Sequence, residues 1–196
     1  MRKFWMTLAL SAALAPISRA TILDFEGLGD DSTVPYGYGG FAWSEFFFSM
    51  DTSLYSGPSG YHNGLVSGQN VAFSAYEQDV FFGLDSGFFD LKSLYLTAAW
   101  DNGLKVAITG HRLGSVVYST EVIVDTTAPT QLVLNWAGVD KVSFHSEPGV
   151  PAGYSGYGKH FVIDDIEVNS VGAVPEPFSL ALGLGGLALA ARRRRR

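Results

Sequence analysis

The chain has 196 residues, of which 14% are aromatic and 23 are glycine, and it contains no cysteine. That length accommodates one ordinary domain plus targeting segments, and the lack of cysteine excludes disulfides, cysteine-ligated zinc and cysteine catalysis. Residues 21–173 contain five basic and 18 acidic side chains, a net charge of −13, so this span should not bind nucleic acid or anionic lipid.

The first 20 residues have the three parts of a secretory signal peptide. Arg2 and Lys3 are basic, residues 4–14 are apolar, and the segment ends with small residues at the two positions that signal peptidase inspects. We therefore expect export, with signal peptidase cutting between Ala20 and Thr21. A retained membrane anchor is the alternative, which the short apolar segment disfavours.

Short runs of β-branched and aromatic residues, separated by glycine-containing turns, recur between residues 21 and 169. Val142 and Phe144 alternate with polar neighbours, which places both on a core face, and Asn102-Gly103 predicts a hairpin turn. The expected strands are residues 21–25, 41–43, 46–48, 71–74, 80–82, 91–98, 104–109, 116–119, 121–124, 131–135, 139–145 and 161–168. The pattern predicts one all-β sandwich or barrel domain, residues 21–169, followed by a linker, residues 170–173.

The C-terminal tail, residues 174–196, combines three features in order. Val174-Pro175-Glu176-Pro177 comes first, residues 178–191 are apolar, and residues 192–196 are all arginine. The prolines keep the first part extended and accessible. The apolar segment is 14 residues long, whereas roughly 20 residues span a bilayer comfortably. We expect a short hydrophobic helix that anchors the chain transiently, with the arginines in the cytoplasm. A final β-strand is the alternative, in which the arginine run would have no role.

This tail resembles the PEP-CTERM sorting signal, which is also labelled an ice-binding-protein C-terminal motif. The resemblance implies processing at residues 174–177 by an exosortase, a membrane-embedded peptidase of exopolysaccharide-forming Gram-negative bacteria. It implies export across the inner membrane, transient anchoring there, and delivery to the cell surface or the extracellular space. It does not imply ice binding.

Six segments of the central domain carry a second resemblance: residues 24–26, 38–43, 68–73, 89–94, 98–100 and 161–166. They resemble uncharacterised secreted jelly-roll domains that are distantly similar to galactose-binding-like and carbohydrate-binding modules. The resemblance implies a jelly-roll-like antiparallel β-sandwich. Because such folds host many functions, it implies architecture more than activity.

Four carboxylates lie at the two ends of this domain: Asp24, Glu26, Asp164 and Asp165. The ends of a jelly roll are often adjacent, and calcium takes about six to eight oxygen ligands. Carbohydrate-binding jelly rolls commonly carry a structural calcium near this place, so the resemblance favours a calcium site built from these side chains. The alternative is solvated charge at a sheet edge, with Asp164 hydrogen-bonded to the backbone.

Tyrosines in glycine-rich loops are the candidate ligand contacts: Tyr36, Tyr38, Tyr154 and Tyr157. A tyrosine ring offers an apolar face on which a sugar can stack and a hydroxyl that forms hydrogen bonds. The alternative is that these rings only cover the loops. Phe41 and Trp43, which lie near Tyr36 and Tyr38, are expected in the core.

We expect no catalytic residue. The histidines lack the spacing of metal ligands, and the chain has no Gly-x-Ser-x-Gly elbow. The sequence thus predicts a non-enzymatic surface or matrix protein, with extracellular polysaccharide as its candidate partner. A structural or adhesive matrix component without a defined ligand is one alternative, and a secreted carbohydrate-active enzyme is the other.

Overall fold

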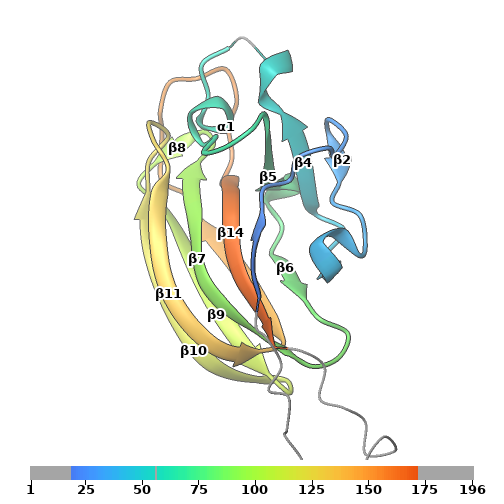
Figure 1. Ribbon diagram of the computed structural model, residues 1–196. Coiled ribbons are helices and arrows are strands. Elements are labelled where there is room, and N and C mark those ends of the chain that lie inside the picture. The colour runs from blue at the N-terminus through green and yellow to red at the C-terminus, as the bar shows by residue number, and fades with distance from the viewer. Residues whose placement is uncertain (1–18, 56, 172–196) are drawn as a thin grey trace, which may run out of the picture.

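The structure, a computed structural model, describes residues 19–55 and 57–171. Two antiparallel sheets pack face to face in these residues (Figure 1). This confirms the expected all-β, jelly-roll-like sandwich. The expected short hydrophobic helix and most of the signal peptide lie outside the described residues. Within the described part of the chain, no helix is long and apolar enough to cross a membrane.

The larger sheet contains seven strands. In spatial order they are β11 (Thr130–Val139), β7 (Phe88–Ala98), β14 (Phe161–Val171), β5 (Asn70–Ser74), β4 (Phe47–Asp51) and β2 (Ser32–Thr33), and β1 (Arg19–Leu23) pairs with β14 beside this row. The strands expected at residues 21–25, 46–48, 71–74, 91–98, 131–135 and 161–168 are confirmed, with shifted or longer bounds.

The smaller sheet contains five strands, and short elements fill the connections. In spatial order the strands are β10 (Ser115–Val124), β9 (Leu104–Arg112), β12 (Lys141–Glu147), β6 (Val80–Gly83) and β3 (Ala42–Trp43). A separate pair joins β8 (Asp101–Asn102) to β13 (Val150–Pro151). The helical elements are η1 (Tyr38–Gly40), η2 (Thr52–Leu54), α1 (Gly60–Asn63) and η3 (Ala75–Glu77). The runs 116–119 and 121–124, expected as two strands, form one strand with a bulge near its start.

The hairpin expected at Asn102-Gly103 is wrong, although the turn exists. Gly103 has a positive φ of 72°, as a tight turn of this kind requires. However, β7 pairs with β11 and β14, whereas β9 pairs with β10 and β12. The turn therefore carries the chain from the larger sheet to the smaller one. Packing of the core between the sheets, and not this turn, determines which strands pair with β7 and β9.

Both ends of the described chain lie in paired strands. β1 pairs with β14 from Arg19 opposite Ser170 to Leu23 opposite Ile166. The expected cleavage between Ala20 and Thr21 falls inside this strand and would leave three of its residues paired. β14 continues to Val171, so the expected linker, residues 170–173, begins within the last strand.

Aromatic rings fill the space between the two sheets. Phe144 on β12 lies 5.4 Å, ring to ring, from Phe161 on β14 and 6.1 Å from Phe47 on β4. Phe144 is 1% exposed and Val142 is fully buried, which confirms the alternation seen in the sequence. Phe41 and Trp43 are also buried, as expected, and both contact Phe82.

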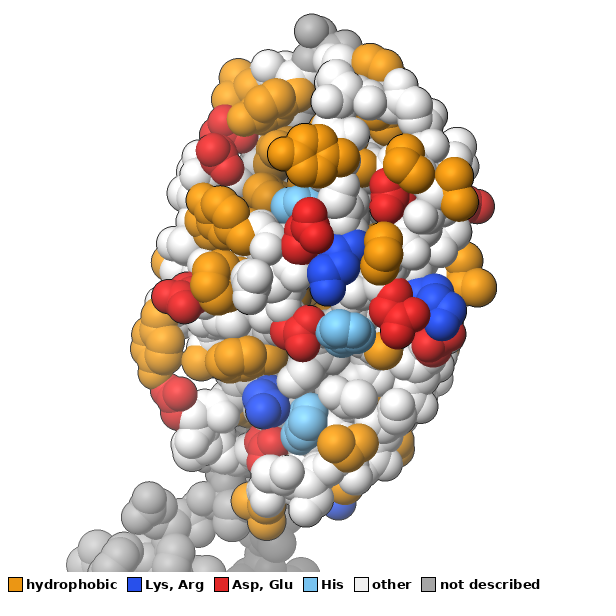
Figure 2. All heavy atoms as spheres, turned by 180° about the vertical axis from the view of Figure 1, so that it is seen from behind, with side chains coloured by type: hydrophobic (Ala, Val, Ile, Leu, Met, Phe, Trp, Pro, Cys, Tyr) orange, Lys and Arg blue, Asp and Glu red, His pale blue; other side chains and the backbone are white. Residues whose placement is uncertain are grey.

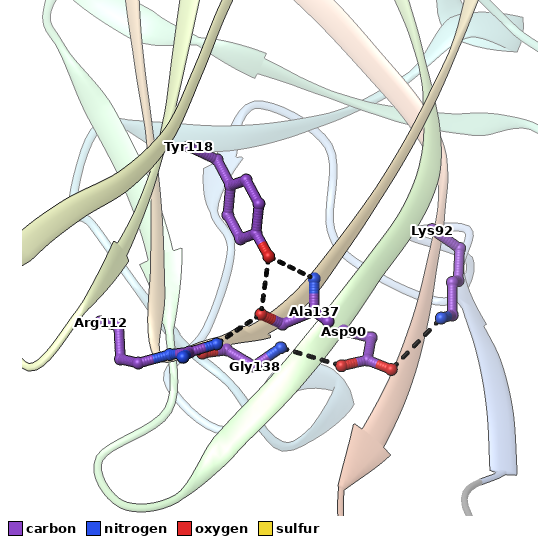
Figure 3. A network of polar contacts seen from close by, with 6 residues as sticks. All are labelled: Asp90, Lys92, Arg112, Tyr118, Ala137 and Gly138. Carbon is purple, nitrogen blue, oxygen red and sulfur yellow. Dashed lines mark hydrogen bonds and ion pairs between the residues drawn. The ribbon is translucent and has the colours of Figure 1, made fainter.

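A polar network ties the bulged end of β11 to three other strands (Figure 3). Arg112 at the end of β9 donates hydrogen bonds to the carbonyl oxygens of Ala137, at 2.7 Å, and Gly138, at 2.5 Å. Tyr118 on β10 contacts both backbone groups of Ala137, and the Gly138 N–H donates to Asp90 on β7. Because β11 makes irregular pairs with β7 here, these bonds satisfy backbone groups that the ladder leaves free.

The outer face of the smaller sheet carries mixed charge. Figure 2 shows acidic, basic and histidine side chains together along the middle of the face seen from behind. Asp79 pairs with His145, and Lys105 lies between Glu121 and Glu147. Such exposed pairs contribute little to stability. Alternating opposite charges give this face no patch of one sign.

Phe144→Ala should lower the free energy of unfolding by roughly 3–5 kcal/mol, because it removes buried apolar area and leaves a cavity between the sheets. Chemical denaturation measures the change. Phe81→Ala is the matched control: Phe81 lies on the neighbouring strand β6 but is 41% exposed, and its loss should cost less than about 1 kcal/mol. Equal losses for the two variants would contradict the burial of Phe144.

Candidate functional site

The outer face of the larger sheet carries a second hydrophobic cluster, which we call the outer cluster. It comprises Tyr61, Val71, Phe73, Ala75, Ala99 and Val162, with Phe48, Met50, Leu65 and Trp100 packed against it. Side chains on β4, β5 and β14 alternate, so the neighbours of these residues enter the core between the sheets while the cluster residues point outward. The helix α1 covers part of the cluster.

The cover fits closely because two glycines allow it. A side chain on Gly60, in α1, would collide with the backbone of Ala98 at the end of β7. Gly156, in the loop before β14, lies against the indole of Trp100, and a Cβ there would come within 2.4 Å of the ring. Helix and loop can therefore approach the aromatic rings beneath them.

Two hollows remain at the margins of this cover. The first hollow has a volume of about 490 Å³ and is lined by Asp31, Phe48, Phe73, Ala75, Tyr76, Glu77, Tyr157 and His160. The second hollow has a volume of about 420 Å³ and is lined by Met50, Leu54, Tyr55, Gly57, Pro58, Ser59, Tyr61, Trp100 and Ser155. Both volumes fall in the range of small-molecule sites, roughly 300–1,000 Å³.

Exposed aromatic rings distinguish the first hollow. Tyr76 is 66% exposed and Tyr157 is 83% exposed, whereas Phe48, whose ring lies 5.7 Å from that of Tyr76, is half-buried. Tyr76 and the adjacent Glu77 both have positive φ values, 55° and 58°. Two consecutive non-glycine residues with positive φ are uncommon, and strained backbone of this kind is often found at ligand sites.

Polar groups in the first hollow can accept hydrogen bonds. The carboxylates of Asp31 and Glu77 line it. His160 Nδ1 lies 2.8 Å from the carbonyl oxygen of Ser74, an acceptor, so Nδ1 donates and Nε2 of the neutral ring is the acceptor. Burial lowers the pKa of His160, which keeps this ring neutral near physiological pH. The hollow thus combines aromatic faces with three hydrogen-bonding side chains.

The structure does not bring the four expected tyrosines together. Tyr157 lines the first hollow. Tyr36 is 73% exposed and donates a hydrogen bond to Asp85, away from both hollows. Tyr38 is half-buried and its ring stacks on that of Phe25. The Tyr38 hydroxyl accepts a hydrogen bond from the backbone N–H of Phe25 at 2.6 Å. Tyr154 is half-buried, with its hydroxyl 3.5 Å from that of Thr126.

Three of the four expected metal-ligating carboxylates accept hydrogen bonds from backbone N–H groups, and Asp165 accepts one from a side-chain hydroxyl. Glu26 accepts hydrogen bonds from the N–H groups of Gln69 and Asn70, each at 2.8 Å. Asp24 accepts from the Glu26 N–H, and Asp165 accepts from the Ser67 hydroxyl at 2.7 Å. Within residues 19–55 and 57–171, no three His, Asp or Glu side chains are grouped closely enough to hold a metal ion.

The expected convergence on one calcium ion is therefore not found in the described residues, and these side chains as placed do not fit such an ion. Calcium binding itself stays a prediction of the sequence.

Asp164 is the most constrained of these side chains. It is fully buried and accepts hydrogen bonds from the N–H groups of Val66, Ser67 and Asp165, at 2.8, 3.2 and 2.8 Å. These bonds fix the loop that leads into β5 and so into the outer cluster. Burial raises the pKa of Asp164 to about 7, and the three backbone hydrogen bonds lower it only in part.

Sequence reasoning missed most of the first hollow. Tyr76 and Glu77 come shortly after a strand and look like ordinary turn residues, and Asp31 is one of several acids in its loop. His160 was set aside because no other histidine has metal spacing to it. The position of Tyr157 within a glycine-rich loop is the one signal in the sequence that points to a residue lining this hollow.

No family model matches this chain, and no curated protein matches it in sequence. Solved structures with a similar arrangement include the cleaved adhesin domain of Lys-gingipain, 13% identical, covering 78% of this chain and 98% of that chain at a TM-score of 0.45. Another is TmCBM61 in complex with β-1,4-galactotriose, 13% identical, covering 74% and 93% at a TM-score of 0.40. A third is the family 32 carbohydrate-binding module from C. perfringens with galactose, 10% identical, covering 66% and 93% at a TM-score of 0.36. Similarity at this level says nothing about what this chain binds.

The stability of the wild type should fall, relative to Asp164→Asn, as pH rises from about 4 to about 7. The unfolded chain releases this proton near pH 3.9, whereas the folded protein keeps it to about pH 7, so the folded state binds more protons between these values. Urea denaturation at stepped pH measures the difference. Glu45→Gln, an exposed change, should keep the wild-type profile.

An identical pH profile for Asp164→Asn and the wild type would contradict the raised pKa.

Melting of the same variants in excess calcium and in chelator tests the calcium prediction. A calcium-dependent rise in the wild type that Asp164→Asn removes would support it, and unchanged melting temperatures would end it.

Proposed function

We propose that this chain is an exported, non-enzymatic protein of the bacterial surface or exopolysaccharide matrix, processed by signal peptidase and an exosortase, and that it binds glycan in the first hollow. The observation that carries glycan binding is the pair of exposed rings, Tyr76 and Tyr157, beside hydrogen-bonding side chains in one hollow. Sorting rests on the three-part tail, whose motif, apolar segment and arginine run occur in the order of the PEP-CTERM signal.

The chemistry of the first hollow suits a sugar. A sugar ring presents an apolar C–H face, which packs on an aromatic ring, and hydroxyl groups around its edge. Tyr76 and Tyr157 supply rings that remain accessible, while Asp31, Glu77 and His160 supply acceptors for hydroxyl protons. Binding sites of this kind pair an apolar surface with a few polar groups that fix orientation.

Tyr157→Ala should weaken glycan binding by about fivefold or more, because removing an aromatic residue that anchors a ligand costs over about 1 kcal/mol. A glycan array with residues 21–173 of the wild type finds the ligand, and titration of that glycan measures the change. Tyr36→Ala is the matched control, since Tyr36 is 73% exposed but lies outside both hollows.

Loss of binding in the Tyr36 variant, with the Tyr157 variant unaffected, would move the site to the loop of residues 34–40. A wild-type protein that binds no glycan would leave the alternative of a structural or adhesive matrix component.

A carbohydrate-active enzyme is the second candidate, because the carboxylates of Asp31 and Glu77 line the same hollow. Glycosidases use two carboxylic groups on either side of the bond they cleave. The array hit, incubated with the wild-type protein, should be recovered intact if the chain only binds it. Shortened products that Glu77→Gln abolishes, with binding retained, would establish the enzyme instead.

Changing Glu176 to Ala should leave a tail-bearing precursor in the membrane, and deleting residues 178–196 should release the domain to the medium. The expectation follows from a weak anchor next to an extended, accessible cleavage motif. Immunoblotting of membrane and medium fractions distinguishes these species. N-terminal sequencing should show that the released protein begins at Thr21. Normal processing of the Glu176 variant would refute the sorting motif.

A further inference from the structure

The second hollow adjoins the first. Phe48 in the first hollow and Met50 in the second are two positions apart on the same face of β4, which places their Cα atoms about 7 Å apart. Phe73 of the first hollow lies 5.0 Å, ring to ring, from Tyr61 of the second, and Tyr61 lies 5.3 Å from Trp100. One row of aromatic rings therefore runs beneath both hollows.

A single loop lies over this row and borders both spaces. Ser155 lines the second hollow and Tyr157 lines the first, and between them Gly156 lies against the indole of Trp100. The loop contributes one residue to each hollow across two positions of chain. The loop therefore separates the two hollows by only two positions of chain, and a ligand that occupies both must cross it.

The charged side chains that line the first hollow are acidic. Among residues 19–55 and 57–171, no lysine or arginine lines either space, whereas Asp31 and Glu77 line the first. At the second, the Tyr55 hydroxyl donates to Asp30 at 2.9 Å, and Asp30 also accepts from the N–H of Asp51. Carboxylates that line a hollow repel anionic groups, so sugars that bear uronic acid, sulfate or phosphate are disfavoured here.

We propose that the two hollows are adjacent subsites for one extended glycan chain, built of neutral or amino sugars and not of acidic ones. This inference rests on the proposed glycan binding and adds the length and the charge of the ligand. The first hollow takes a sugar ring between exposed tyrosines. The second, with its Leu54, Met50 and Pro58 lining, takes a less polar neighbouring unit of the same chain.

The test uses residues 21–173 on printed glycans of one to six units, in neutral, amino-bearing and acidic series. The variants are Tyr157→Ala for the first hollow and Leu54→Ser for the second, and Leu54 is 65% exposed, so the fold should tolerate the change. The matched control is Leu113→Ser, an 81% exposed leucine that lines neither hollow.

The wild type should bind chains of three or more neutral or amino units at least about tenfold more tightly than the single unit of the same series. Leu54→Ser should lose this advantage of length and keep the affinity for the single unit, whereas Tyr157→Ala should weaken both. Leu113→Ser should match the wild type.

Four results would count against the proposal, each against a different part or basis of it. Equal affinity for one unit and for longer chains, or a Leu54→Ser profile like that of the wild type, would leave a single subsite while glycan binding stands. Preference for the acidic series would refute the charge argument alone. Binding to no glycan of any length would instead remove the proposed function itself.

Discussion

The fold depends on strands that are buried on both faces. All five residues of β5 are buried, and β14 alternates between Phe161 and Ile163, which enter the core, and Val162, which belongs to the outer cluster. An antiparallel sandwich usually leaves its outer faces to water. Here the outer face near β4, β5 and β14 is apolar, so other parts of the chain must cover it, and the burial of that face stabilises the cover.

The cover explains where the hollows are. The helix α1 is only four residues long and could not persist alone, but Gly60 lets it approach the end of β7 and Ser59 caps it. The loop that contains Gly156 closes on Trp100 from the other side. Between these two coverings the aromatic rings stay partly accessible, and that accessibility is what a ligand can use.

Two acidic side chains hold in place the loop that leads into the outer cluster. Each carboxylate accepts hydrogen bonds from two consecutive backbone N–H groups of the loop 66–70, which leads into β5. Asp164 binds those of residues 66 and 67, and Glu26 binds those of residues 69 and 70. Gly68 within that loop has a positive φ, and a Cβ there would meet the Glu26 carboxylate at 2.1 Å. The carboxylate can approach the loop so closely because that position has no side chain.

The sequence by itself determined the strands, because alternation of apolar and polar residues is a local property of the chain; Val142 and Phe144 are an example. It also predicts targeting segments at both ends, because their charge and hydrophobicity can be read without a fold. Only the tertiary structure decided which strands pair, so Asn102-Gly103 links two sheets instead of one hairpin. Of the first hollow, Tyr157 alone was predicted, since Asp31, Tyr76 and His160 are far apart in sequence and meet only through sheet order and loop packing. The same holds for the hydrogen-bond donors that reach Asp24, Glu26, Asp164 and Asp165. The sequence shows that a carboxylate can accept hydrogen bonds, but which donors reach it depends on how distant segments pack.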